Sequence, residues 1–104
     1  MRERALRIRV PGRVPVTLAG RSYEVRNISV TGAVGVLMGP QLMRGTVHPL
    51  YIGGATDTLE LNVQVVRAHP VGEWWETAVA FQGPATPHRI GAFIAMLMRG
   101  FRQP

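Results

Sequence analysis

Two short stretches in the first third of the chain combine residue types that suit an anionic, planar ligand. The first places two arginines around a Pro-Gly pair, and the second joins an amide, a hydroxyl and a glycine: Arg9 and Arg13, then Asn27, Ser29 and Gly32. The arginine guanidinium donates paired hydrogen bonds to phosphate oxygens and to the O6/N7 edge of guanine. Asn and Ser add short polar contacts, and Gly lets a backbone approach closely. Together these residues suit a guanine nucleotide.

The order and spacing of the two stretches resemble the PilZ domain, a bacterial receptor module for cyclic di-GMP. The resemblance rests on R-x-x-x-R from Arg9 to Arg13, followed by N-x-S-x-x-G from Asn27 to Gly32. It extends to the runs 14–16, 65–67 and 78–81, so it covers nearly the whole chain. Each motif alone is weak, whereas their common order and strand context make the match fairly specific.

The resemblance implies that the arginines hold the ligand. In the family, the residues matching Arg9 and Arg13 bind the phosphates and the Hoogsteen edges of guanine, on an arm that folds over the ligand. Arg7 is a weaker auxiliary candidate. An isolated pair of arginines in this composition is usually a pair of solvated charges, and the downstream motif is what favours a site here.

The resemblance also gives the polar strand edge a role, in which Asn27 contacts a guanine, Ser29 lies by phosphate and Gly32 shapes the turn. All three residue types are also common where a strand meets a turn, and Gly32 could simply supply a positive φ. Asn27 and Ser29 lie on the same side of an extended chain, so they can face one ligand together. Trp74 is a weaker candidate for covering a nucleotide, since packing is the commoner role of such a residue.

The composition describes one basic domain. The chain has 104 residues, 46% of them hydrophobic and 17% charged, which indicates a single globular unit. All 12 basic residues are arginine, against 6 acidic residues, and the net charge of +6 predicts an anionic partner such as a nucleotide, nucleic acid or acidic lipid. A GC-rich genome also favours arginine, so part of this charge is a solvated face.

Neither catalysis nor metal binding finds support in the sequence. The chain has no cysteine, its 3 histidines are far apart, and no carboxylate pair accompanies a nucleophile. A P-loop is absent. We therefore expect no enzyme activity, no metal and no cofactor, with cyclic di-GMP as a ligand only. No apolar run is long enough to cross a bilayer and no signal peptide opens the chain, so we expect a cytoplasmic domain, or one at the cytoplasmic face of the inner membrane.

Hydropathy patterns indicate an all-β domain in three parts. Residues 1–13 are predicted to be a flexible basic arm, 14–83 a small antiparallel six-stranded β-barrel of PilZ type, and 84–104 a C-terminal α-helix with its lead-in. The clearest strand is 58–68, where Leu59, Leu61, Val63 and Val65 alternate with polar residues. A turn at 70–72 leads to a strand over 74–81, with one tryptophan in the core. Closure into a barrel would remove exposed edges.

The helix is predicted over 88–101, after an N-cap at Thr86 and a first-turn proline. Its apolar residues exceed what one flank of a barrel needs, with Ile94, Met96 and Met98 in surplus. An exposed apolar patch usually marks an interface, so we expect this helix to contact a second copy or a neighbouring domain of a parent protein. Burial of these side chains in the domain's own core is the alternative.

The leading hypothesis is a cyclic di-GMP receptor domain without enzyme activity, which regulates an attached or partner protein. A cellulose synthase catalytic subunit is one family setting in which such a domain occurs. The first alternative is a PilZ-like protein-interaction module that does not bind nucleotide. The second is a general nucleic-acid-binding small barrel, although the chain lacks the repeated exposed aromatic residues that single-strand binding uses.

Overall fold

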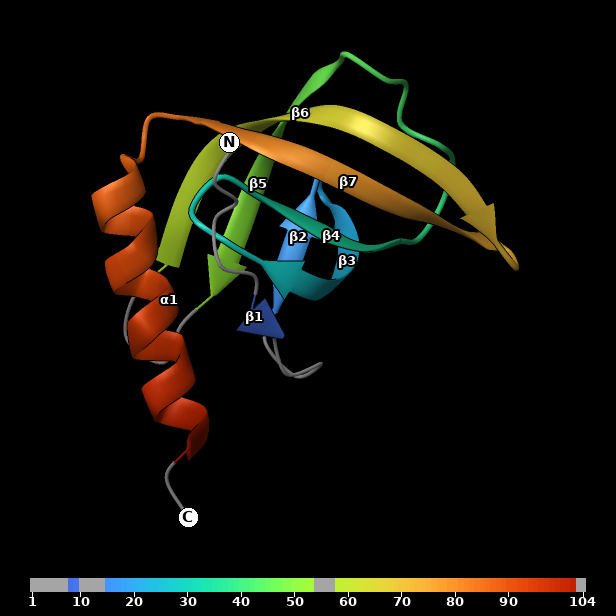
Figure 1. Cartoon of the computed structure of the whole chain (residues 1–104). Coiled ribbons are helices and arrows are strands. Elements are labelled where there is room, and N and C mark those ends of the chain that lie inside the picture. Colours follow the sequence, from blue (N-terminus) through green and yellow to red (C-terminus); the bar gives the residue numbers. More distant parts are fainter. Residues whose placement is uncertain (1–7, 10–14, 54–57, 103–104) are drawn as a thin grey trace, which may run out of the picture.

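Seven strands followed by one helix make up the described part of the chain (Figure 1). The structure is a computed structural model that describes residues 8–9, 15–53 and 58–102, with side chains over 15–53 and 58–96. The elements are β1 (Ile8–Arg9), β2 (Val16–Leu18), β3 (Arg21–Ile28), β4 (Gly32–Leu37), β5 (Val47–Gly53), β6 (Thr58–Val71), β7 (Trp74–Gly83) and α1 (Pro87–Arg102).

The strands form one antiparallel sheet that closes on itself. Its order is β1-β3-β2-β5-β6-β7-β4, and an additional pairing of β4 with β3 closes the sheet. Strands β2 to β7 therefore make a closed barrel of six strands, and β1 lies beside the far end of β3. Closure satisfies the backbone donors and acceptors that edge strands would expose. The predicted fold class is confirmed.

Alternation along the strands builds the barrel interior. Leu59, Leu61, Val63 and Val65 are all buried, as their spacing predicts, and Glu60 between them is exposed. The other strands add these buried apolar side chains to the same core: Val16, Leu18, Tyr23, Val25, Ile28, Ala33, Leu37, Leu50, Ile52 and Val79. Full burial of such a side chain contributes about 1.5–3 kcal/mol, so the core is the main stabilising feature.

Helix α1 completes the core along one side of the barrel (Figure 1). Thr86 is the N-cap, since its Oγ1 accepts a hydrogen bond of 3.2 Å from the backbone N–H of Arg89. Ile90, Phe93 and Ile94 are buried in the core cluster, and Met96 packs against it half-buried. The prediction that Ile94 is surplus to the core was therefore wrong, because the barrel flank is wide enough to bury it.

Two details of the β6–β7 hairpin differ from the prediction. Strand β6 continues through Pro70 to Val71, opposite Trp75 and Trp74, so the turn lies after Val71. Proline is accommodated because β6 pairs with β5 only up to Gln64, leaving one side of this end free of a ladder partner. Neither tryptophan joins the core: Trp74 is exposed and Trp75 is half-buried. The hairpin reaches beyond the barrel wall, where it offers too few neighbours to bury an indole (Figure 1).

Candidate functional site

The expected basic arm contains a strand that pairs beside the polar edge. In β1, Ile8 lies opposite Ile28 and Arg9 opposite Asn27, both in antiparallel register with β3. Directly opposite residues in such a ladder have Cα atoms about 4.5–5.5 Å apart. The Arg9 side chain, together with Arg7 and Arg13, lies outside the described residues. The backbone pairing of β1 with β3 therefore brings the R-x-x-x-R motif next to the N-x-S-x-x-G motif, although the two are separated in the sequence.

A β-bulge in β3 decides which way Asn27 faces. The register against β4 shifts between Val25 and Asn27, so Arg26 is an extra residue without its own partner. Strict alternation from Val25, which is buried, would place Asn27 in the core. Instead Ile28 takes the core position and Asn27 is half-buried at the barrel surface. Bulges commonly redirect a side chain in this way next to functional sites.

Ser29 holds the turn between β3 and β4. It is buried, with 2% of its surface exposed, and its Oγ accepts a hydrogen bond of 3.2 Å from the Thr31 backbone N–H. The same Oγ lies 3.0 Å from Thr31 Oγ1. The Ser29 N–H donates to the Gly32 carbonyl oxygen at 2.9 Å. Thr31 is the exposed hydroxyl of this turn, a residue that the sequence analysis did not single out although its S-x-T spacing was visible.

Gly32 is required by close packing and not by the turn. Its φ is not positive, which corrects the alternative that it supplies a left-handed turn conformation. A Cβ atom at this position would instead collide with the backbone carbonyl oxygen of Val79 in β7. Gly32 lies opposite Ala80 in the β4–β7 ladder. The glycine therefore lets β4 lie tightly against β7 immediately after the Ser29 turn.

Trp74 does not join this group. Gly32 lies opposite Ala80 and Leu37 opposite Trp75, so Trp74 occupies the other end of β7. At about 3.4 Å per residue, the stretch from Ala80 to Trp74 spans roughly 20 Å. Trp74 is 42% exposed, on the hairpin that projects from the barrel (Figure 1). Local sequence could not show this separation, because it follows from the register between β4 and β7.

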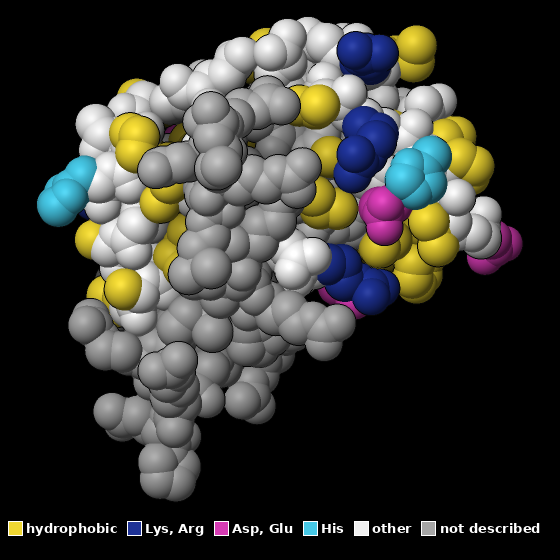
Figure 2. Space-filling model, in the orientation of Figure 1, with side chains coloured by type: hydrophobic (Ala, Val, Ile, Leu, Met, Phe, Trp, Pro, Cys, Tyr) yellow, Lys and Arg dark blue, Asp and Glu magenta, His cyan; other side chains and the backbone are white. Residues whose placement is uncertain are grey.

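Charged side chains gather on one part of the barrel surface. Figure 2 shows arginine, histidine and acidic side chains over one half of the face that it draws, interspersed with apolar side chains. Arg26 pairs with Glu24 at 3.5 Å, and both side chains are at least half exposed. Such an exposed pair contributes little stability, on the order of 0–1 kcal/mol. Arg21 instead caps the β4–β5 loop by donating to the carbonyl oxygens of Met38 and Pro40.

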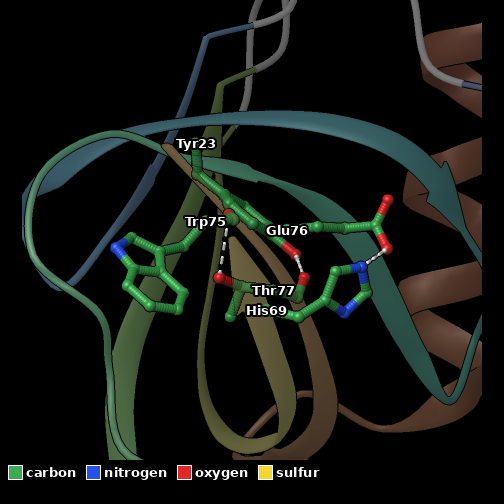
Figure 3. A network of polar contacts seen from close by, with 5 residues as sticks. All are labelled: Tyr23, His69, Trp75, Glu76 and Thr77. Atoms are coloured by element: carbon green, nitrogen blue, oxygen red, sulfur yellow. Dashed lines mark hydrogen bonds and ion pairs between the residues drawn. The ribbon is translucent and has the colours of Figure 1, made fainter. Parts of the chain in front are cut away.

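A network of polar contacts links β3 to β7 (Figure 3). The Tyr23 hydroxyl donates to the Thr77 carbonyl oxygen at 2.7 Å, and Thr77 Oγ1 donates to the Trp75 carbonyl oxygen at 3.1 Å. On the outside, His69 Nε2 lies 3.0 Å from Glu76 Oε1. Burial raises the pKa of the Tyr23 hydroxyl, and the nearby Glu76 carboxylate raises it further. Tyr23 therefore remains a neutral donor that ties β3 to β7.

The described residues offer no sign of two other kinds of site. No group of three or more His, Asp or Glu side chains among them could hold a metal ion. Within the same residues, no helix is both long and apolar enough to span a bilayer.

Comparisons with known proteins give a family from one model and a shared fold from solved structures. A family model described as PilZ domain matches residues 1–97. An uncharacterised Legionella protein has a similar structure, with a TM-score of 0.68, 21% identity, and coverage of 94% of this chain and 99% of that one. The Bacillus subtilis inhibitor of motility MotI/DgrA has a TM-score of 0.72 at 18% identity, covering 100% of this chain and 53% of its own.

The Escherichia coli protein YcgR, crystallised in complex with cyclic di-GMP, is a further structural neighbour. Its TM-score is 0.71 at 17% identity, with coverage of 97% of this chain and 48% of that chain. This chain thus spans about half the length of both YcgR and MotI/DgrA. At these identities the likeness establishes the fold. Comparison with curated proteins gives no match.

Proposed function

The chain belongs to the PilZ domain family, and from this premise we propose that it is a regulatory domain, without enzyme activity, that binds cyclic di-GMP. The ligand is held by Arg9 and Arg13 on one side and by the edge from Asn27 to Gly32 on the other. The bound state is then transmitted to an attached or partner protein.

The observation that carries this proposal is the register of Arg9 opposite Asn27. A cyclic dinucleotide of guanine offers two phosphates and two base edges, so its site needs cationic forks and a small amide within one ligand's reach. The β1–β3 ladder provides that proximity through backbone pairing alone. Arg13 follows four residues after Arg9 in the same segment.

Each residue of the polar edge has a proposed task that its environment supports. Asn27 offers both a donor and an acceptor at the surface, as recognition of a guanine edge requires. Ser29 is buried, so it acts mainly by holding the turn, and the exposed Thr31 hydroxyl is the one available to a phosphate. Gly32 fixes β4 against β7. Ligand binding would then fix the arginine segment against a prebuilt edge, a shift between two states of the domain.

Two structural neighbours favour a regulatory role. YcgR is a protein whose structure holds cyclic di-GMP, and MotI/DgrA is named an inhibitor of motility. Both are about twice as long as this chain, which agrees with a sensor domain acting on a further part or partner. A setting in cellulose synthase draws no support from these neighbours, none of which carries that name.

A calorimetric titration tests the proposal against its two alternatives. The protein is titrated with cyclic di-GMP, with GTP and with a short single-stranded DNA at the same salt concentration. Heat of binding is expected for cyclic di-GMP at concentrations where the other two give none. No heat from folded protein at high micromolar ligand would favour the protein-interaction module. Comparable binding of the DNA would favour the nucleic-acid barrel, whose affinity should also fall steeply with salt.

A further inference from the structure

A second β-bulge lies in β6, level with the bulge in β3. The register of β6 against β7 shifts between Val65 and Arg67, so Val66 is the extra residue. Asn27 follows the first bulge and lies opposite Val34, and Arg67 follows the second and lies opposite Ala78. Val34 and Ala78 are themselves partners in the β4–β7 ladder. One row of neighbours therefore crosses four strands in the order Asn27, Val34, Ala78, Arg67.

The second bulge turns Arg67 out of the barrel. Val63 and Val65 are buried, and strict alternation would carry Arg67 into the same interior. Both Val66 and Arg67 are instead exposed. In the sequence, Arg67 continues the alternating spacing of the buried residues Val63 and Val65, where a charged residue is unexpected. The bulge explains this position, because it turns the arginine to the outside. The two bulges thus act as a pair that presents an amide and a guanidinium on the same outer face.

Between these two side chains the surface is low and apolar. Val34 and Ala78 are half-buried and have short apolar side chains, so within this row no long side chain lies between Asn27 and Arg67. Three strand spacings of about 4.8 Å put the ends of the row roughly 14 Å apart. Arg67 makes no hydrogen bond or ion pair with any other described residue, whereas Arg26 pairs with Glu24 and Arg21 caps a loop. Its donors are therefore uncommitted within the described part of the chain.

We propose that Arg67 is a further ligand-binding residue, whose guanidinium contacts the half of the cyclic dinucleotide that lies away from Arg9. The inference rests on the proposed function. A ligand with two guanines and two phosphates presents acceptors at both of its ends, and an arginine fork matches either kind of acceptor. The apolar side chains of Val34 and Ala78, which lie between Asn27 and Arg67 in the row, contact the flat face of a guanine base.

The test is a calorimetric titration of Arg67→Ala with cyclic di-GMP beside the unaltered protein. Loss of a charge-assisted contact should weaken binding on the order of 10- to 100-fold. Arg67→Lys keeps the charge but loses the planar guanidinium, so its affinity for cyclic di-GMP should lie between those of Arg67→Ala and the unaltered protein. Arg44→Ala is the matched control and should bind as the unaltered protein does. Arg44 is an exposed arginine outside the row. Its neighbour Gly45 donates a hydrogen bond of 2.8 Å to the Val65 carbonyl oxygen of β6. The substitution Arg44→Ala therefore removes the same charge close to the strand that carries Arg67.

Ala78→Leu provides a second variant that leaves every charge in place. The larger side chain raises this part of the surface, so binding should weaken although Arg67 is present. Thermal melting without ligand verifies that each variant folds. Equal binding by Arg67→Ala and the unaltered protein would overturn the inference while the proposed function stands, as would an equal loss in Arg44→Ala. Absence of binding by the unaltered protein would instead overturn the proposed function and this inference with it.

Discussion

Arg9 lies directly opposite Asn27 in the antiparallel ladder between β1 and β3. This pairing brings the upstream arginine motif to the strand edge where Ser29 holds the turn and Gly32 packs against β7. An amide and a cation are thereby placed within reach of one ligand by main-chain hydrogen bonding, before any side chain acts. The consequences can be tested residue by residue.

Arg9→Ala and Arg13→Ala should each weaken cyclic di-GMP binding by about 1–3 kcal/mol, since each removes a charge-assisted contact. Calorimetry gives the affinity, and circular dichroism should show an unchanged fold. Arg2→Ala is the control, because it removes the same charge outside the motif. Equal losses at all three positions would indicate diffuse attraction between a basic domain and an anion, and would contradict a defined site.

Trp74→Ala should leave the affinity for cyclic di-GMP unchanged. Trp74 lies roughly 20 Å along β7 from Ala80, the partner of Gly32, and about 14 Å from Ala78, the β7 residue of the proposed row, so we do not expect it to contact the same ligand. Fluorescence or calorimetric titration of the variant provides the measurement. A large drop in affinity, with the melting temperature preserved, would mean that the ligand reaches the β6–β7 hairpin.

Gly32→Ala should destabilise the domain by about 1–3 kcal/mol, because the new Cβ meets the Val79 carbonyl oxygen and β4 must move away from β7. Urea denaturation measures the change in the free energy of unfolding. Gly91→Ala is the contrasting variant: it lies in α1, where the new Cβ would approach Val30 Cγ1 at 3.4 Å. Its helix propensity should make the domain more stable by up to about 1 kcal/mol. Similar effects at both positions would argue against close packing as the reason for Gly32.

The free energy of unfolding should fall as the pH rises above about 10, the ordinary pKa of tyrosine. In that range the unfolded chain loses the Tyr23 proton while the folded protein keeps it, because burial raises the pKa of Tyr23. The unfolded state then binds fewer protons, so stability decreases with pH. Tyr23→Phe should remove this dependence and cost about 1 kcal/mol at neutral pH through the lost hydrogen bond. Tyr51→Phe, at an exposed tyrosine, should keep the dependence.

The two methionines of α1 should respond differently to replacement by glutamine. Met96 packs half-buried against the core, so Met96→Gln should lower the free energy of unfolding by about 1 kcal/mol. The side chain of Met98 lies outside those described, and the predicted contact of this helix with a second copy or neighbouring domain stays a prediction. Sedimentation tests it: Met98→Gln should reduce self-association while the domain remains folded. Unfolding of Met98→Gln would place this residue in the domain's own core.

Local patterns in the sequence were sufficient for the barrel strands, the helix and the family, but they predicted neither β1 nor the continuation of β6 to Val71. Alternation from Leu59 to Val65 determines which face of β6 is buried, because side chains of a strand point to opposite sides in turn. Thr86 marks the start of α1, because its hydroxyl satisfies a backbone N–H that the first turn leaves unpaired. The arginine and N-x-S-x-x-G motifs were readable for the same reason, since their spacing is a property of the chain alone.

The arrangement of the surface was decided only by the tertiary structure. The bulges before Asn27 and Arg67 depend on which residues of β4 and β7 lie opposite, and that register follows from closure of the barrel. The same register separates Trp74 from the polar edge and presses Gly32 against Val79. Sequence periodicity describes one strand at a time, whereas a site across four strands is a property of their mutual alignment, which long-range packing determines.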